Sequence, residues 1–224
     1  MDTILPRKAQ QPSVVSRVDK QATALARARY DRQASSYDRR QGMLEGMQRP
    51  WRKRLWGMVN GPRVLEVGVG TGLNMPYWPA DVEVTATDLS PRMLERARER
   101  AAELGLVADL RLADVQALEL PDSSFETAVA TCVFCSVPDA VLGLRELGRV
   151  VRPGGQILLL EHMRPENPFL GALTDLLTPL SVRLTGANLN RRTLENIRAA
   201  GLKIGSVEDL AMAGMFKLIV AQPG

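Results

Sequence analysis

The most informative stretch of this sequence reads Arg63-Val64-Leu65-Glu66-Val67-Gly68-Val69-Gly70-Thr71-Gly72. Its first half has the apolar character of a buried strand, and three glycines follow at once. Glycine lets the backbone turn tightly, and it leaves room for a ligand against the main chain where a side chain would collide. The pattern therefore predicts a strand that ends in a ligand-binding turn.

The glycine turn alone leaves the kind of ligand open. A dinucleotide fingerprint would place another glycine three positions after Gly70, where this sequence has Leu73, so a nicotinamide enzyme is the weaker interpretation. The next apolar run ends in Asp88, and a carboxylate there can accept both hydroxyls of a ribose. Asp114 follows a third run and suits the exocyclic amine of an adenine. The three features together predict a site for a ligand with a ribose and an adenine.

Short apolar runs alternate with helical patterns along the rest of the chain, which favours an α/β domain with a largely parallel sheet. The last two runs are joined by a short link that contains glycine, so they predict a hairpin carrying one antiparallel strand. Strands are expected at 63–67, 82–88, 109–112, 127–134, 156–162, 204–210 and 216–221, and helices from Asn74 and over 91–104, 139–150 and 192–200.

Composition bounds the class of protein. The 224 residues are 45% hydrophobic and 24% charged, values that exclude a disordered chain, a collagen and a disulfide scaffold. No run of about 18 apolar residues occurs, and the first residues lack the apolar stretch of a secretory signal. The two cysteines suit a reducing compartment. We therefore expect a cytoplasmic protein.

The charge is unevenly divided along the chain. Residues 1–60 carry 13 Lys and Arg against 5 Asp and Glu, a net charge of +8, whereas residues 61–224 carry a net charge of −4. We expect a basic helical arm and lid over 1–60, with a frayed start at 1–12, and one catalytic domain over 61–224. Such a basic arm favours contact with an anionic surface, although a solvated basic helix would have the same composition.

These motifs resemble those of the class I S-adenosylmethionine-dependent methyltransferases, and the resemblance covers about residues 64–221. It implies a Rossmann-like, seven-stranded, mostly parallel sheet with one antiparallel strand, with helices on both faces and an N-terminal helical arm. It also implies S-adenosyl-L-methionine as the cofactor. The matching blocks are 64–72, Thr87-Asp-Leu-Ser-Pro-Arg-Met-Leu94, Ala113-Asp-Val-Gln-Ala117, Pro121-Asp-Ser-Ser-Phe125 and Arg149-Val-Val-Arg-Pro-Gly-Gly155.

The resemblance further implies which residues hold the cofactor. The methionine moiety would lie over the glycine turn, the ribose on Asp88 and the adenine amine on Asp114. Backbone at the end of the fourth strand would flank the sulfonium. The whole predicted cofactor-binding set is Tyr30, Glu66, Gly68, Gly70, Gly72, Asn74, Asp88, Leu89, Met93, Asp114, Val115, Ala130 and Thr131.

Other blocks resemble narrower groups of methyltransferases. The arm segment Tyr30-Asp-Arg-Gln-Ala-Ser-Ser-Tyr37-Asp38 is similar to the opening of methylases that act on quinones and lipids. Segments 132–137, 160–163 and 185–193 resemble the bacterial phospholipid N-methyltransferases of the Rhodobacter type and the related membrane-associated thiol methyltransferases. They imply methylation of the amine headgroup of phosphatidylethanolamine towards phosphatidylcholine. A quinone, a thiol or another small hydrophobic acceptor is the alternative, and a nucleic-acid methyltransferase or a non-catalytic binding module is less favoured.

Several residues are candidates for catalysis and acceptor binding. His162, the single histidine of the chain, is expected at a strand end, where it would serve as a base or as a structural residue. Tyr37, with Tyr30, could face a methylated ammonium or hold the lid closed. The predicted acceptor-binding residues are Arg191 and Arg192, as phosphate ligands, and Cys135, at the border of the acceptor cavity. The Cys132-x-x-Cys135 spacing lacks the further ligands of a zinc site, so no metal is expected.

A phospholipid acceptor would require contact with a membrane. The segment Arg49–Val59 offers cations beside Trp51, Leu55 and Trp56, so we expect it to bind an anionic membrane surface. The rival expectation is that these aromatic and apolar side chains pack the helix onto the sheet domain. The expected location is cytoplasmic, with peripheral association at the inner face of the membrane and without nucleic-acid binding. The sequence leaves the oligomeric state open.

Overall fold

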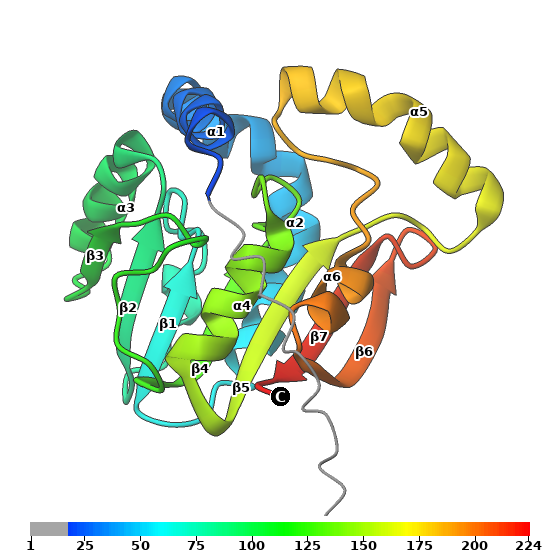
Figure 1. The fold of residues 1–224 in the computed structure, drawn as a ribbon. Helices are drawn as coiled ribbons and strands as arrows, with labels where there is room; N and C mark the ends of the chain where they lie inside the picture. The colour runs from blue at the N-terminus through cyan, green and yellow to red at the C-terminus, as the bar shows by residue number, and fades with distance from the viewer. Residues whose placement is uncertain (1–17) are drawn as a thin grey trace, which may run out of the picture.

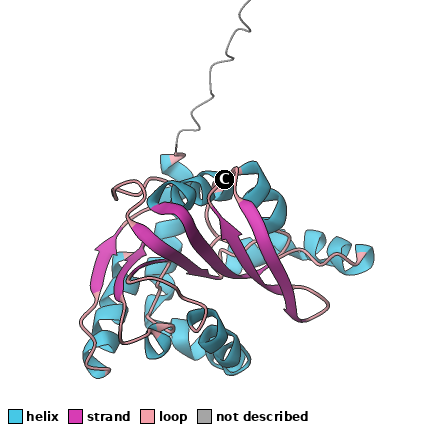
Figure 2. Cartoon of the chain, turned by 90° about the horizontal axis from the view of Figure 1, so that it is seen from below, coloured by secondary structure: helices cyan, strands magenta, loops and turns pink. Residues whose placement is uncertain are grey.

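The computed structural model describes residues 18–224, in which a seven-stranded sheet carries helices on both faces (Figures 1 and 2). The predicted frayed segment 1–12 lies outside the described residues. The strands are β1 (Arg63–Val67), β2 (Glu83–Asp88), β3 (Asp109–Leu112), β4 (Phe125–Thr131), β5 (Val151–His162), β6 (Lys203–Ala211) and β7 (Phe216–Gln222). Their order across the sheet is β3-β2-β1-β4-β5-β7-β6.

The sheet topology confirms the predicted fold class. Strands β3, β2, β1, β4 and β5 are parallel neighbours, whereas β7 runs antiparallel to both β5 and β6. The strand β7 is therefore inserted between its predecessor in the chain and β5, with Leu159 opposite Ile219. Such a mostly parallel sheet with one antiparallel strand brings the carboxyl ends of β1, β2 and β4 to one edge, where α/β proteins place their ligands.

Side-chain alternation along the strands divides the core between the two faces of the sheet. Leu65 and Val67 point to one face, where they share a buried cluster with helices α4 (Ala140–Val150) and α6 (Thr193–Ala199). Val64 points to the other face and packs with Leu55 and Trp56. The remaining helices are α1 (Lys20–Gln33), α2 (Tyr37–Trp56), α3 (Pro91–Glu103) and α5 (Pro168–Leu184), with short 3₁₀ turns η1 (Ala34–Ser36) and η2 (Met75–Tyr77).

Three local expectations were wrong. The helix expected from Asn74 is only the 3₁₀ turn η2, because Trp78 is extended before Pro79 and ends it. Pro50 suits the first turn of a helix and was expected to begin one, but it lies inside α2, so this helix gives up one backbone hydrogen bond there. The segment after β5, for which the sequence predicted no element, contains the helix α5.

The structure also corrects the predicted membrane anchor. Leu55 and Trp56 are 0% and 1% exposed, because they pack the end of α2 against the sheet. Trp51 stacks on Phe216 with ring centroids 5.4 Å apart. Arg52, one of the cations assigned to the membrane, is buried among polar side chains. The rival expectation therefore holds, and this face of α2 is not available to a bilayer.

Candidate active site

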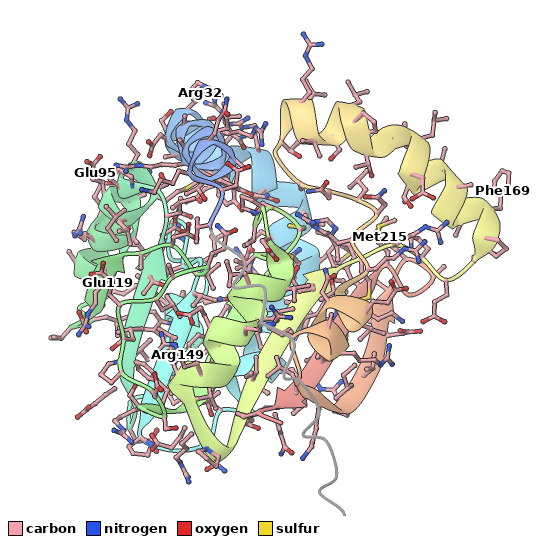
Figure 3. All side chains as sticks on the ribbon, viewed as in Figure 1. Arg32, Glu95, Glu119, Arg149, Phe169 and Met215 are labelled. Atoms are coloured by element: carbon pink, nitrogen blue, oxygen red, sulfur yellow. The ribbon has the colours of Figure 1, made fainter. Side chains whose placement is uncertain are left out.

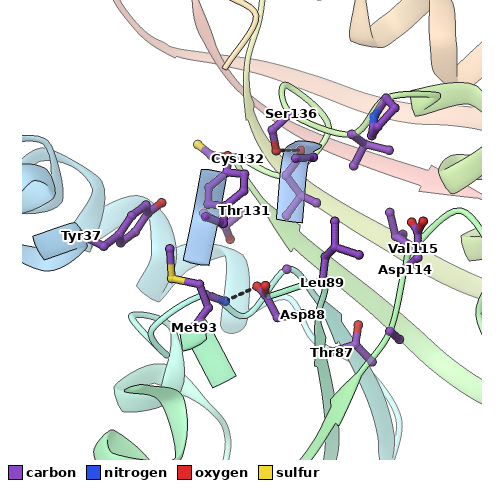
Figure 4. A pocket seen from close by; sticks show the side chains of 18 residues that line it. Tyr37, Thr87, Asp88, Leu89, Met93, Asp114, Val115, Thr131, Cys132 and Ser136 are labelled. Carbon is purple, nitrogen blue, oxygen red and sulfur yellow. Dashed lines mark hydrogen bonds between the residues drawn. The ribbon is translucent and has the colours of Figure 1, made fainter. Parts of the chain in front are cut away.

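A cavity of about 720 Å³, counting the part open to solvent, lies at the carboxyl ends of β1, β2 and β4. In Figure 4 Tyr37 approaches it from the arm, while Asp114 and Val115 lie on the opposite side. Its volume is in the range of small-molecule sites. The cavity is lined by Ala26, Tyr30, Tyr37, Gly68, Gly70, Thr87, Asp88, Leu89, Met93, Ala113, Asp114, Val115, Thr131, Cys132, Val133, Ser136, Val137 and Pro138.

The glycine turn forms the floor of this cavity. Gly70 has a φ of +59°, and the nearest heavy atom to a Cβ built there would be the carbonyl oxygen of Gly68, 4.0 Å away. A side chain at Gly70 would therefore extend into the cavity. Gly68 has a different reason to be glycine, because its Cβ would lie 2.5 Å from Cγ2 of Val133. The turn thus leaves an uncovered stretch of main chain.

Asp88 stands at the end of β2 with both carboxylate oxygens in hydrogen bonds. Its Oδ2 accepts from the backbone N–H of Gly70 at 2.8 Å, and its Oδ1 accepts from that of Ser90 at 2.8 Å. Burial raises the pKa of Asp88 to about 6, although these backbone donors oppose the shift. The carboxylate is fixed in place, and each oxygen has a further lone pair for a hydroxyl donor.

Asp114 lies across the cavity from the glycine turn. Its carboxylate accepts from the hydroxyl of Thr23 at 3.2 Å and from the side-chain amide of Gln116 at 3.0 Å. Leu89, Met93 and Val115 supply the apolar surface near it. An acid beside an apolar surface would suit an aromatic ring that carries an amine, and this role of Asp114 stays a prediction.

The arm covers the cavity by bonding to the loops that surround it. Asp31 of α1 accepts a hydrogen bond from the hydroxyl of Ser90 at 2.6 Å. Asp38 of α2 accepts one from Thr71 at 2.6 Å and pairs with Arg100 at 2.6 Å. The loops that follow β1 and β2 are therefore tied to the arm.

Two arm tyrosines, Tyr30 and Tyr37, line the cavity. Burial is the main cause that raises the pKa of both phenols, so both hydroxyls are neutral at pH 7. A neutral tyrosine presents a hydrogen-bond donor and an aromatic face, and the latter attracts cations.

Glu66 and Asn74, two predicted cofactor ligands, form a buried polar chain with the arm and are not among the residues that line the cavity. Glu66 accepts from the Asn74 side chain at 2.6 Å and from the indole of Trp78 at 2.8 Å. Asn74 in turn accepts from Arg52 at 2.7 Å, and Arg52 pairs with Glu45 at 3.1 Å. Burial raises the pKa of Glu66 to about 7.

The far wall of the cavity is the loop after β4, residues 132–138. It begins at Cys132, whose φ of +54° is unusual for a residue with a side chain. Glu161 accepts from the backbone N–H groups of Val133 and Phe134 at 2.8 and 3.0 Å. Asn188 and Arg191 donate to the carbonyls of Cys135 and Val137. The segments after β5 therefore hold this wall in place.

Four other predicted site residues lie outside the cavity lining, as does the third glycine, Gly72. Gly72 packs against Met75, while Ala130 and Cys135 are buried in the protein. The Arg191 guanidinium donates to the carbonyl of Val137, and Arg192 pairs with Glu195 at 3.2 Å on the surface. Neither arginine is placed as a phosphate ligand by this geometry.

His162 is also outside the lining. Its ring lies 6.1 Å from that of Phe216, and its Nδ1 is buried without a hydrogen-bond partner among the described residues. Burial lowers the pKa of His162 to about 4, so the ring is neutral. The predicted role as a base has no geometric support.

Sequence reasoning missed several lining residues, among them Ala26 and Ser136. Ala26 belongs to the buried side of α1, a helix with little amphipathic contrast, so no pattern marked it. Ser136 follows the apolar strand end, and only the turn after Cys132 brings it back to the cavity. The sequence places Ser136 in the loop after a predicted strand, which was a usable signal, but it does not show in which direction the side chain points.

Residues 65–159 match the family model described as a methyltransferase domain. This part of the chain is therefore a methyltransferase domain, and its match implies S-adenosyl-L-methionine as the cofactor.

More particular similarities lie within that family. The chain is 42% identical, over 54% of its length, to a phosphatidylethanolamine N-methyltransferase of Cereibacter sphaeroides, and it is 33% identical, over 66%, to the ubiquinone/menaquinone biosynthesis C-methyltransferase UbiE of Bdellovibrio bacteriovorus. The matches span 62% and 66% of those relatives. A solved methyltransferase from Thermotoga maritima shares the fold, with a TM-score of 0.65, 21% identity and coverage of 88% of this chain and 97% of its own.

The residues present fit the cofactor. The uncovered main chain at Gly70 offers a surface against which the methionine moiety can lie, since no side chain covers it. The carboxylates of Asp88 and Asp114 line the same cavity, with apolar side chains between them. These are the hydrogen-bond acceptors and the surfaces that a ribose, an amine and an adenine ring require.

Proposed function

We propose that this protein transfers a methyl group from S-adenosyl-L-methionine to the amine headgroup of phosphatidylethanolamine. The observation that carries the proposal is one cavity that joins the Gly70 turn and the strand-end acids to two arm tyrosines. The similarity to a phosphatidylethanolamine N-methyltransferase supports the choice of acceptor. The cofactor, when bound, supplies a methyl group on a positively charged sulfur.

The chain's own residues would contribute alignment and exclusion of water. Methyl transfer is an in-line displacement that depends on orientation more than on covalent catalysis. Asp88, Asp114 and the glycine turn would fix the cofactor, and the arm would close over it as a lid. In this proposal, residues 1–60 form the arm and residues 61–224 form the domain that the arm covers.

Tyr30 and Tyr37 would receive the acceptor. Their faces can attract a methylated ammonium by roughly 0.5–2 kcal/mol, which favours an amine that gains charge and methyl groups as it reacts. Their neutral hydroxyls could orient the amine before transfer. A phospholipid acceptor lies at the surface of a bilayer. Three exposed cations of α1 would favour contact with an anionic bilayer: Lys20, Arg27 and Arg32. Within residues 18–224, no helix is both long and apolar enough to cross a membrane.

A quinone is the second candidate acceptor, because relatives that act in ubiquinone and menaquinone synthesis also match. Incubation of the protein with radiolabelled S-adenosyl-L-methionine and a whole-cell lipid extract tests both. We expect label in methylated derivatives of phosphatidylethanolamine, and a Gly70→Val variant gives the background. Label confined to a quinone fraction would overturn the phospholipid proposal, as would absence of label from a protein that binds S-adenosylhomocysteine.

A further inference from the structure

Helix α5 has its polarity reversed with respect to an ordinary surface helix. The side that faces the protein is made of Gly171, Thr174 and Thr178, which are buried. The two threonine hydroxyls donate to carbonyls of their own helix, Thr174 to Gly171 at 2.8 Å and Thr178 to Thr174 at 2.7 Å. A surface helix normally turns its apolar side inward. Here the small and polar side is inward.

The outward side of α5 is a leucine stripe, which we define as Leu173, Leu176, Leu177 and Leu180. Their exposed fractions are 44%, 76%, 41% and 56%, and their spacing places them on one side of the helix. Phe169 and Leu184, at the two ends of α5, are 79% and 63% exposed. Contiguous apolar side chains of this kind mark a site of interaction with a protein or a membrane.

The leucine stripe lies at the same end of the molecule as the cavity and α1. Figure 1 shows α1 and α5 side by side beyond the carboxyl ends of the strands, and Figure 3 shows Phe169 at the outer end of α5 and Arg32 above α1. The two helices are joined where the side chain of Gln33 donates to the carbonyl of Thr185 at 3.2 Å.

Charge around the leucine stripe favours an anionic surface. The acid on α5, Asp175, pairs with Arg164 at 3.0 Å and accepts from Asn190 at 3.1 Å. Exposed Lys20, Arg27 and Arg32 of α1 lie at the same end of the molecule. An apolar stripe beside cations is the composition of a helix that lies in the interface of an anionic bilayer. Two copies joined symmetrically through this face would bring like charges together.

We propose that the leucine stripe of α5 docks on the surface of an anionic phospholipid bilayer, with α1 supplying the cations, so that the cavity reaches the headgroups. This inference rests on the proposed function, because only a phospholipid acceptor requires the protein to contact a bilayer. It moves the membrane contact from the buried end of α2 to the opposite end of the molecule. With 17 residues, α5 is about 25 Å long and lies along the surface.

The test is co-sedimentation of the full chain with vesicles of phosphatidylethanolamine and phosphatidylglycerol. We expect the variant L173Q/L176Q/L177Q/L180Q to lose about tenfold or more of its vesicle binding, since four exposed leucines that would enter the bilayer become polar. The matched control is L104Q/L112Q, which changes leucines that are 43% and 53% exposed on other parts of the surface. It should bind vesicles as the original protein does.

Two further measurements separate the possible failures. Thermal shift with S-adenosylhomocysteine should be equal in both variants, which shows that they fold. The rate of methyl transfer to detergent-dispersed phosphatidylethanolamine should also be equal in the two variants. If neither the variants nor the original protein methylated this lipid, the proposed acceptor would be refuted, but the result on vesicle binding would still stand. Equal vesicle binding by the stripe variant and the original protein would overturn the inference. So would a stripe variant that turns a dimer into a monomer without change in vesicle binding, because a second copy would then cover α5.

Discussion

Substitution of Glu161 by Gln should change how the stability of this protein depends on pH. The Glu161 side chain is fully buried, and its Oε1 accepts the two backbone N–H groups that shape the loop after β4. Its Oε2 has no hydrogen-bond partner among the described residues. Burial raises the pKa of this carboxyl from 4.5 to about 7. Glutamine keeps the accepting oxygen and cannot become charged.

The sign follows from proton binding. Between pH 4.5 and about 7 the folded protein holds the Glu161 proton while the unfolded chain has released it. The contribution of Glu161 to stability is therefore present below this window, falls as the pH rises through it, and is lost above it. Each unit of pKa difference corresponds to about 1.4 kcal/mol, so the change amounts to about 3 kcal/mol.

Thermal unfolding of both proteins at pH 5 and pH 8.5 measures this change. Relative to the original protein, Glu161→Gln should gain roughly 6–12 °C in Tm on going from the lower to the higher pH, at 2–4 °C per kcal/mol for a chain of this size. Glu195→Gln, at an exposed ion pair, is the control and should show no such gain. A Tm difference that is the same at both pH values would refute the reasoning, because Glu161 would then not titrate in this range.

Three other predictions concern the cofactor site and the arm. Asp88→Asn should weaken S-adenosylhomocysteine binding roughly 5- to 150-fold in calorimetry, because a hydroxyl loses its charged acceptor at a cost of about 1–3 kcal/mol; unchanged affinity would remove the ribose assignment. Gly70→Val should stay soluble yet transfer no methyl group, since its side chain would enter the cavity; retained turnover would place the ligand elsewhere. Arg52→Met should lower the unfolding free energy in urea by about 3–5 kcal/mol, because Glu45 loses its buried partner, and the double variant with Glu45→Gln should recover part of that loss.

The sheet could be predicted because its strands are apolar runs separated by helical patterns. Asp88 and Asp114 could be placed for the same reason, since the residue after a parallel strand lies at the ligand-binding edge. Their position requires no knowledge of distant contacts. The final hairpin, with its antiparallel strand, was also accessible from the short link between its strands.

The failures have physical causes in particular residues. The side chain of Glu66 points to the face covered by α2, and no local pattern pairs it with Arg52 through Asn74. Trp56 and Leu55 were read as surface residues because basic neighbours surround them in sequence, whereas only tertiary packing buries them. Helix α5 was not predicted although its leucines recur at helical spacing, because Pro179 lies inside it and a proline in a sequence normally ends a helix.

The insertion of β7 between β5 and β6 has a consequence for how the chain folds during synthesis. The chain leaves the ribosome in sequence order, so β6 emerges before β7 and has no strand to join until residues 216–222 follow. Until then the edge of β5, with the apolar side chains of Leu158 and Leu160, remains unpaired. Such an edge is a template for aggregation. A delay that leaves β5 outside the ribosome before β7 can reach it should therefore be the most hazardous moment in the synthesis of this domain.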